Sequence, residues 1–225
     1  MSDFILELKD ISYGYQDGGK KRMILKNCSY KFERGKFYTI LGPSGSGKTT
    51  LLSMASALDV PEDGVIEYEG RELKKIGYNK YRRNHMAIIF QKYNLVDYLT
   101  GIENVEAGMM IGRHKVRGDK KEISYKILDA MGIVKTKADR RVTKLSGGEQ
   151  QRVAIAKALA KDVDLILGDE PTGSLDTATS NEVIELFRLL ANEYGKTIIL
   201  VTHSDAVAAK SDVSLRLRDG QLMPF

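Results

Sequence analysis

One stretch of nine residues constrains the fold more than any other part of the chain. It reads Gly42-Pro43-Ser44-Gly45-Ser46-Gly47-Lys48-Thr49-Thr50. It fits the phosphate-binding pattern G-x-x-x-x-G-K-[ST] at every defined position. The apolar segment 37–41 before it is typical of a buried strand, and the segment 49–55 begins a helix. A glycine-rich turn between strand and helix directs backbone N–H groups at an anion, so the chain is predicted to bind a nucleoside triphosphate.

Several side chains in or near this stretch suit bound nucleotide. Lys48 would supply a positive charge to the outer phosphates, and the Thr49 hydroxyl is suited to Mg²⁺. Tyr13 and Tyr15 lie just before the first predicted turn. Either ring is able to stack on a purine, and the residues alone leave the choice open.

The composition excludes several other classes of protein. A length of 225 residues suits one large α/β domain or two small ones, and a net charge of +5 with dispersed basic residues gives no reason to expect nucleic-acid binding. The single cysteine, Cys28, excludes an internal disulfide. No apolar run approaches the roughly 20 residues of a membrane span. If the protein acts at a membrane, we expect another chain to supply the spans.

Polar side chains follow three further predicted strands. The strand 165–168 leads into the carboxylates Asp169 and Glu170, at the edge where open α/β sheets bind ligands. Asp169 is suited to Mg²⁺ and Glu170 to polarising an attacking water. Gln91 and His203 each follow an apolar strand. Such residues are more often structural, but a doubly wound sheet would place the His203 strand beside the phosphate-loop strand.

A second helix start is predicted at Leu145-Ser146-Gly147-Gly148-Glu149-Gln150. Ser146 and Glu149 have the spacing of a capping box. Capping alone does not explain Gly147 and Gly148, whose N–H groups would be open to an anion.

No strand is evident between residues 92 and 144, which predicts a mostly helical insertion. Its first part, 93–99, is largely apolar. We keep two interpretations of this stretch: a small core beneath the insertion, or a surface that receives another protein.

The order of these motifs resembles that of the ATP-binding cassette ATPases over nearly the whole chain. Residues 170–176 are similar to the branch of macrolide efflux, lipoprotein release, antimicrobial-peptide resistance and cell division, although Gly168 stands where that branch more often has alanine. The resemblance implies an α/β P-loop NTPase with a RecA-like parallel sheet core. It also implies an N-terminal antiparallel β subdomain and a helical subdomain at about 92–144, within a single domain spanning 1–225.

The resemblance further implies an ATPase that works as a head-to-tail pair. Ser146, Gly147 and Gly148 of one copy would cap the γ-phosphate that Lys48 of the other copy holds. Tyr15 rather than Tyr13 would stack on adenine, and Asp169, Thr49 and Gln91 would serve Mg²⁺. Glu170 would be the general base, and His203 would contact the γ-phosphate or the attacking water.

The same resemblance implies a partner and a location. Two copies would assemble on a separate transmembrane permease, at the cytoplasmic face of the cell membrane. They would drive export, extraction or force transmission, and the sequence does not specify the cargo. A soluble cassette ATPase of translation or DNA maintenance is the alternative, but those proteins carry two cassettes or long coiled coils. A phosphate-loop kinase or GTPase would not need residues 145–150 or His203.

Overall fold

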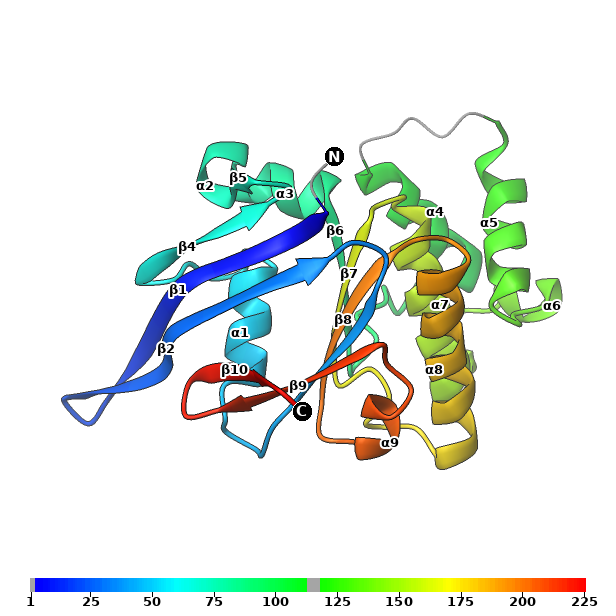
Figure 1. Cartoon of the computed structure of the whole chain (residues 1–225). Helices are drawn as coiled ribbons and strands as arrows, with labels where there is room; N and C mark the ends of the chain where they lie inside the picture. The colour runs from blue at the N-terminus through cyan, green and yellow to red at the C-terminus, as the bar shows by residue number, and fades with distance from the viewer. Residues whose placement is uncertain (1–2, 113–117) are drawn as a thin grey trace.

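The strands of this computed structural model form two sheets of different kinds (Figure 1). Residues 3–112 and 118–225 are described, so positions 113–117 of the predicted insertion lie outside the described residues. The first sheet is antiparallel and contains, in spatial order, β2 (Lys20–Glu33), β1 (Phe4–Asp17), β4 (Asp63–Tyr68) and β5 (Arg71–Glu72). The second contains β10 (Gln221–Pro224), β9 (Val213–Arg218), β3 (Phe37–Leu41), β8 (Thr197–Thr202), β7 (Leu165–Asp169) and β6 (Met86–Phe90).

The second sheet is parallel from β9 to β6, and only the edge strand β10 runs the other way. Strands β3 and β8 are buried along their whole length. Their side chains alternate between two hydrophobic cores, as the period of a strand requires. Phe37 belongs to one core, whereas Tyr38 and Ile40 belong to the other.

Helices cover both faces of this parallel sheet. Helix α1 (Lys48–Ala55) shares one core with the antiparallel sheet, so that it lies between the two sheets. Helices α7 (Gly147–Ala160) and α8 (Thr177–Asn192) share the other core. Short helices α2 (Leu73–Ile76), α3 (Tyr78–Asn84) and α9 (Asp205–Ala208) connect strands.

A group of helices lies on the side of the molecule away from β1 and β2 (Figure 1). It comprises α4 (Gly101–Ile111), α5 (Lys120–Ala130), α6 (Lys135–Ala138) and the 3₁₀ turn η1 (Val142–Lys144). Helix α4 begins at a capping box of Thr100 and Glu103 and packs on α7. Within residues 3–112 and 118–225, no helix is both long and apolar enough to cross a membrane.

The predicted fold class is confirmed. The parallel order places the carboxyl ends of β3, β8, β7 and β6 along one edge of the second sheet. The phosphate loop, His203, Glu170 and Gln91 follow these four strands directly. All four motifs therefore gather at the ligand-binding edge of the sheet.

Candidate active site

The phosphate loop turns from β3 into α1 around Gly47. This residue is the N-cap of α1 and has a φ of 100°, a backbone conformation that favours glycine. A Cβ atom at this position would also lie 2.5 Å from Cγ2 of Ile24. The N-cap has no side-chain hydrogen bond, and the first turn holds no acidic residue. The first N–H groups of α1 are therefore suited to an anion.

The Lys48 side chain folds back across its own loop. Its ammonium donates to the carbonyl oxygens of Gly42 at 2.6 Å and Pro43 at 3.1 Å. The Ser46 hydroxyl is buried and finds no hydrogen-bond partner in the part of the chain that the structure describes. A charged amine and an orphaned hydroxyl in one glycine-rich turn are donors that a phosphate would satisfy.

The space around the loop is open rather than enclosed. Two depressions of about 420 and 440 Å³ border it, and a third of about 430 Å³ lies at the ends of β6 and β7. One involves Pro43 to Ser46, one combines Pro43 with His203, and one combines Gln91 with Asp169. A nucleotide on this surface would have one side uncovered by the chain that holds it.

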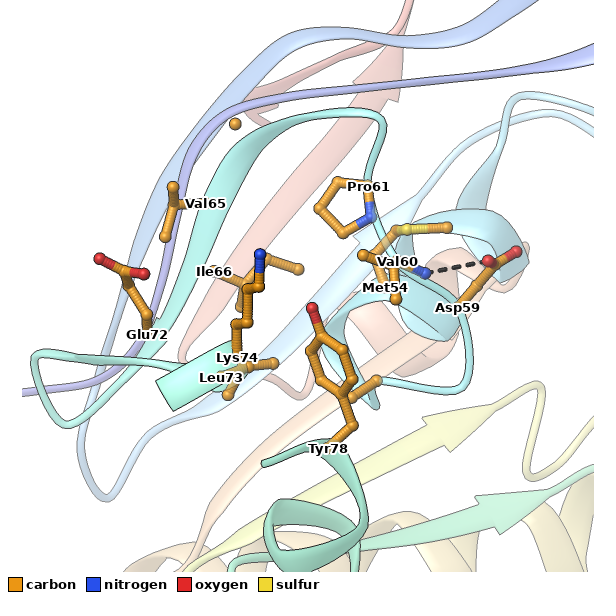
Figure 2. A pocket seen from close by; sticks show the side chains of 12 residues that line it. Met54, Asp59, Val60, Pro61, Val65, Ile66, Glu72, Leu73, Lys74 and Tyr78 are labelled. Carbon is orange, nitrogen blue, oxygen red and sulfur yellow. Dashed lines mark hydrogen bonds between the residues drawn. The ribbon is translucent and has the colours of Figure 1, made fainter. Parts of the chain in front are cut away.

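Figure 2 shows a different cavity of about 420 Å³, between the end of α1, β4 and α2. Met54, Ile66 and Leu73 contribute apolar walls, and Lys74 and Tyr78 contribute polar groups. It includes none of the predicted site residues. The phosphate-binding motifs therefore define the site, and this cavity does not.

Two side-chain oxygen atoms suited to a metal ion, from Thr49 and Asp169, lie close together between α1 and β7. The Thr49 hydroxyl donates to Oδ1 of Asp169 at 3.4 Å. Burial raises the pKa of Asp169, an effect that the Thr49 hydrogen bond opposes. Among residues 3–112 and 118–225, no group of three or more His, Cys, Asp or Glu is arranged to hold a metal ion by itself. One carboxylate with hydroxyl and amide oxygens fits Mg²⁺, which takes its remaining ligands from phosphates and water.

Glu170 lies beside His203 at the ends of β7 and β8. Its Oε1 atom is 2.9 Å from Nδ1 of His203, and its Oε2 atom accepts a hydrogen bond of 3.2 Å from Thr202. Its backbone has a φ of 45°, in the left-handed region, and its N–H donates to the carbonyl of Val201. Strain of this kind is concentrated at functional sites. The Glu170 carboxylate is thus oriented from two sides.

Gln91 is exposed and approaches the loop that follows Glu170. A Cβ atom added at Gly173 would lie 2.9 Å from Nε2 of Gln91. The structure thus brings Gln91, Asp169 and Glu170 into one region with Lys48 and Thr49.

The start of α7 is built differently. Ser146 and Glu149 form the predicted capping box, and Glu149 also pairs with Lys137 at 2.6 Å. The pKa of Glu149 is lowered, first by Lys137 and then by the N–H of Ser146. The two glycines have close neighbours within the chain. A Cβ atom added at Gly147 would lie 2.8 Å from the Tyr93 hydroxyl, and one added at Gly148 would lie 2.3 Å from Cγ2 of Thr179.

These contacts supply a reason for both glycines that the sequence did not reveal. The side chains concerned come from the loop after β6 and from the first turn of α8. None of the nearest neighbours of Gly147 and Gly148 belongs to the phosphate loop of the same chain. The structure therefore does not bring Ser146, Gly147 and Gly148 to Lys48.

The two tyrosines differ in what surrounds them. The Tyr13 hydroxyl donates to Asp59 at 2.6 Å, whereas the Tyr15 side chain is 48% exposed and its hydroxyl is 3.4 Å from that of Thr50. The Tyr15 ring, packed edge-on against Tyr13, is the one open to a ligand beside the phosphate loop.

The stretch 93–99 divides between its two interpretations. Leu95 packs against the core that contains α7, as a small core beneath the insertion requires. Tyr98 is 74% exposed, as a surface for another protein requires.

The fold and these motifs define a P-loop nucleotide-binding protein of the α/β class. A family model described as ABC transporter matches residues 25–173, and the chain belongs to that family. It is 42% identical to the uncharacterized ABC transporter ATP-binding protein YclH of Bacillus subtilis, over 96% of this chain and 94% of that protein. It is 40% identical to the lipoprotein-releasing system ATP-binding protein LolD 1 of Chlorobium chlorochromatii, over 90% and 83%.

A solved structure agrees over the whole fold. It is the dimeric post-hydrolysis state of the ATP-binding cassette MJ0796 of Methanocaldococcus jannaschii, bound to ADP and Pi. The TM-score is 0.87 at 33% identity, with 98% of each chain covered. The predicted family and branch are confirmed. The chain is therefore an ATP-binding subunit of the ABC transporter family, and the solved cassette that it resembles is a dimer that holds the products of ATP hydrolysis.

Proposed function

We propose that two copies of this chain hold two ATP molecules between them, head to tail, and hydrolyse them at the cytoplasmic face of a membrane to drive the permease. One observation carries this proposal. Each chain presents a phosphate loop near the carboxylate of Glu170, and separately a second glycine-rich helix start that contacts other parts of its own chain. Antiparallel pairing would bring each chain's second helix start to the other's phosphate loop.

Each side chain has a defined task in this arrangement. Tyr15 stacks on the adenine, while Lys48 and the loop N–H groups hold the β- and γ-phosphates. Thr49, Asp169 and Gln91 would hold Mg²⁺, which neutralises phosphate charge when bound. Ser146, Gly147 and Gly148 of the partner copy cover the γ-phosphate from the open side.

The chemistry is the attack of water on the γ-phosphorus, which breaks the bond to the β–γ bridging oxygen. Glu170 accepts the proton of that water. His203, whose Nδ1 is 2.9 Å from Glu170, keeps the carboxylate in place and lies next to the γ-phosphate.

The substitution Glu170→Gln tests this function. The amide keeps the size of the side chain but cannot accept the proton, so hydrolysis should slow by about 10²–10⁴-fold while ATP still binds. The variant should then accumulate as an ATP-bound pair, measured by light scattering. A variant that remains monomeric with ATP and hydrolyses at the parent rate would remove Glu170 from the reaction.

A further inference from the structure

The loop after β6 contains two consecutive residues in a rare backbone conformation. Tyr93 has a φ of 57° and Asn94 a φ of 51°. Asparagine adopts this left-handed conformation more readily than most residues, but tyrosine does not. Such a pair persists only where surrounding contacts hold it.

Those contacts come from two elements that belong to different halves of the proposed site. The Tyr93 hydroxyl lies 3.3 Å from the hydroxyl of Ser174, in the loop that follows Glu170. On the other side, the Lys157 ammonium of α7 donates to the carbonyl of Asn94 at 3.2 Å. The strained pair therefore spans from α7 to the catalytic loop.

The Tyr93 hydroxyl also borders the first residue of α7. A Cβ atom at Gly147 would lie only 2.8 Å from this hydroxyl and 3.8 Å from Cδ2 of Leu175. One oxygen atom thus contacts both the helix start that would cover the partner's γ-phosphate and the loop that carries the chain's own base.

We propose that Tyr93 is a positioning residue whose hydroxyl fixes the start of α7 relative to the loop 170–176. This inference rests on the proposed function, because it assumes that the two elements act in two different ATP sites of one pair. The two copies close on ATP only when the start of α7 and the loop 170–176 are both correctly positioned. Tyr93 therefore acts on pairing, whereas Lys48 and Tyr15, which are not its neighbours, bind ATP to each separate copy.

The test is a double-mutant cycle of Tyr93→Phe and Ser174→Ala in the Glu170→Gln chain. Each substitution removes one hydroxyl and should raise the ATP concentration for half-maximal pairing about fivefold, the equivalent of one hydrogen bond. The double variant should need no more ATP for half-maximal pairing than the more affected single variant, because both substitutions remove the same contact. Affinity of the separate copy for ATP, measured with Ser146→Arg added to block pairing, should not change.

The matched control is Tyr125→Phe, which removes a hydroxyl that donates to Asp139 within the helical group. Pairing should be unchanged in this variant. Unchanged pairing in Tyr93→Phe, or multiplied effects in the double variant, would overturn the proposal. So would a loss of ATP affinity in the separate copy.

A second measurement separates this inference from the proposed function. In the chain with Glu170 intact, Tyr93→Phe should raise the KM for ATP about fivefold and change kcat less than twofold. If the Glu170→Gln parent does not pair with ATP, the proposed function is wrong. If the KM for ATP is unchanged in Tyr93→Phe, the role of Tyr93 is wrong, whatever the outcome of the first measurement.

Discussion

Helices α1 and α7 both begin at glycine-rich turns, yet their first turns are satisfied in different ways. Helix α1 has an N-cap glycine without a side-chain hydrogen bond, no acidic residue in its first turn, and Lys48 across the loop. Helix α7 is closed by Ser146 and Glu149, so only the N–H groups of Gly147 and Gly148 stay outside the capping box.

This difference decides what each helix start is able to bind alone. The first turn of α1 offers N–H groups and a cation to a phosphate. The first turn of α7 places the Glu149 carboxylate beside its two free N–H groups, which disfavours an isolated anion. It suits a phosphate whose charge another copy's Lys48 already balances. The comparison therefore explains why one chain would hold two unequal halves of a site.

The largest expected effect is at α1. Lys48→Ala removes the cation from the outer phosphates and should abolish ATPase activity, while its unfolding temperature stays close to that of the parent. Activity is measured by phosphate release from the purified protein. Undiminished turnover would show that the α1 turn is not the primary phosphate site.

A smaller effect is expected at α7, from Gly148→Ala. The new methyl group would meet Cγ2 of Thr179, and overpacking of this kind costs about 1–3 kcal/mol of unfolding free energy. Thr179→Ser removes that methyl but keeps a hydroxyl for Asp176, so adding it should restore stability in denaturant unfolding.

ATPase activity separates the two roles of Gly148 in this double variant. If Gly148 also faces the partner's phosphate, the rate should remain below that of Thr179→Ser alone. Full recovery of the rate with the stability would leave Gly148 a packing role only.

The smallest effect concerns the cap of α7. The pKa of Glu149 is lowered in the folded chain, so its carboxylate stabilises the fold above the ordinary pKa. This contribution is lost as the pH falls through the lowered value. Glu149→Gln keeps the hydrogen-bond acceptor but not the charge. It should lower the free energy of unfolding by only about 0.5 kcal/mol near neutral pH, because water screens the ion pair with Lys137.

Denaturant unfolding at several pH values measures the contribution of the Glu149 charge to the free energy of unfolding. The difference between parent and Glu149→Gln should close in acid. A difference that is independent of pH would mean that the charge contributes nothing to the cap.

The sequence was sufficient for features that depend on neighbours along the chain. The phosphate loop, the capping box at Ser146 and the carboxylates after β7 are local patterns, and strand order then placed the phosphate loop and the carboxylates at one edge of the sheet. Contacts between distant segments were not predictable. The residues alone did not distinguish Tyr13 from Tyr15, and only the family resemblance favoured Tyr15, because the hydrogen bond that occupies Tyr13 comes from Asp59, 46 residues further along the chain.

The same limit applied to the start of α7. Its two glycines contact Tyr93 and Thr179, which no spacing rule connects to them. Tyr93 was interpreted only as part of an apolar stretch. The hydroxyl contact with Ser174 depends on a left-handed backbone that the sequence does not indicate at a tyrosine.

In the proposed pair, each ATP site combines α1 of one copy with α7 of the other. Mixing Lys48→Ala with Ser146→Arg, two variants expected to be inactive alone, tests this arrangement. In a mixed pair, Lys48 of one copy would meet Ser146 of the other in one intact site. A mixed pair has one intact site out of two, and Ser146→Arg does not pair with itself, so the ATPase rate should recover to at most about half of the wild-type rate and should increase with protein concentration. If the ATPase rate of the mixture equals the sum of the rates of the two separate variants at every protein concentration, the shared-site arrangement is wrong.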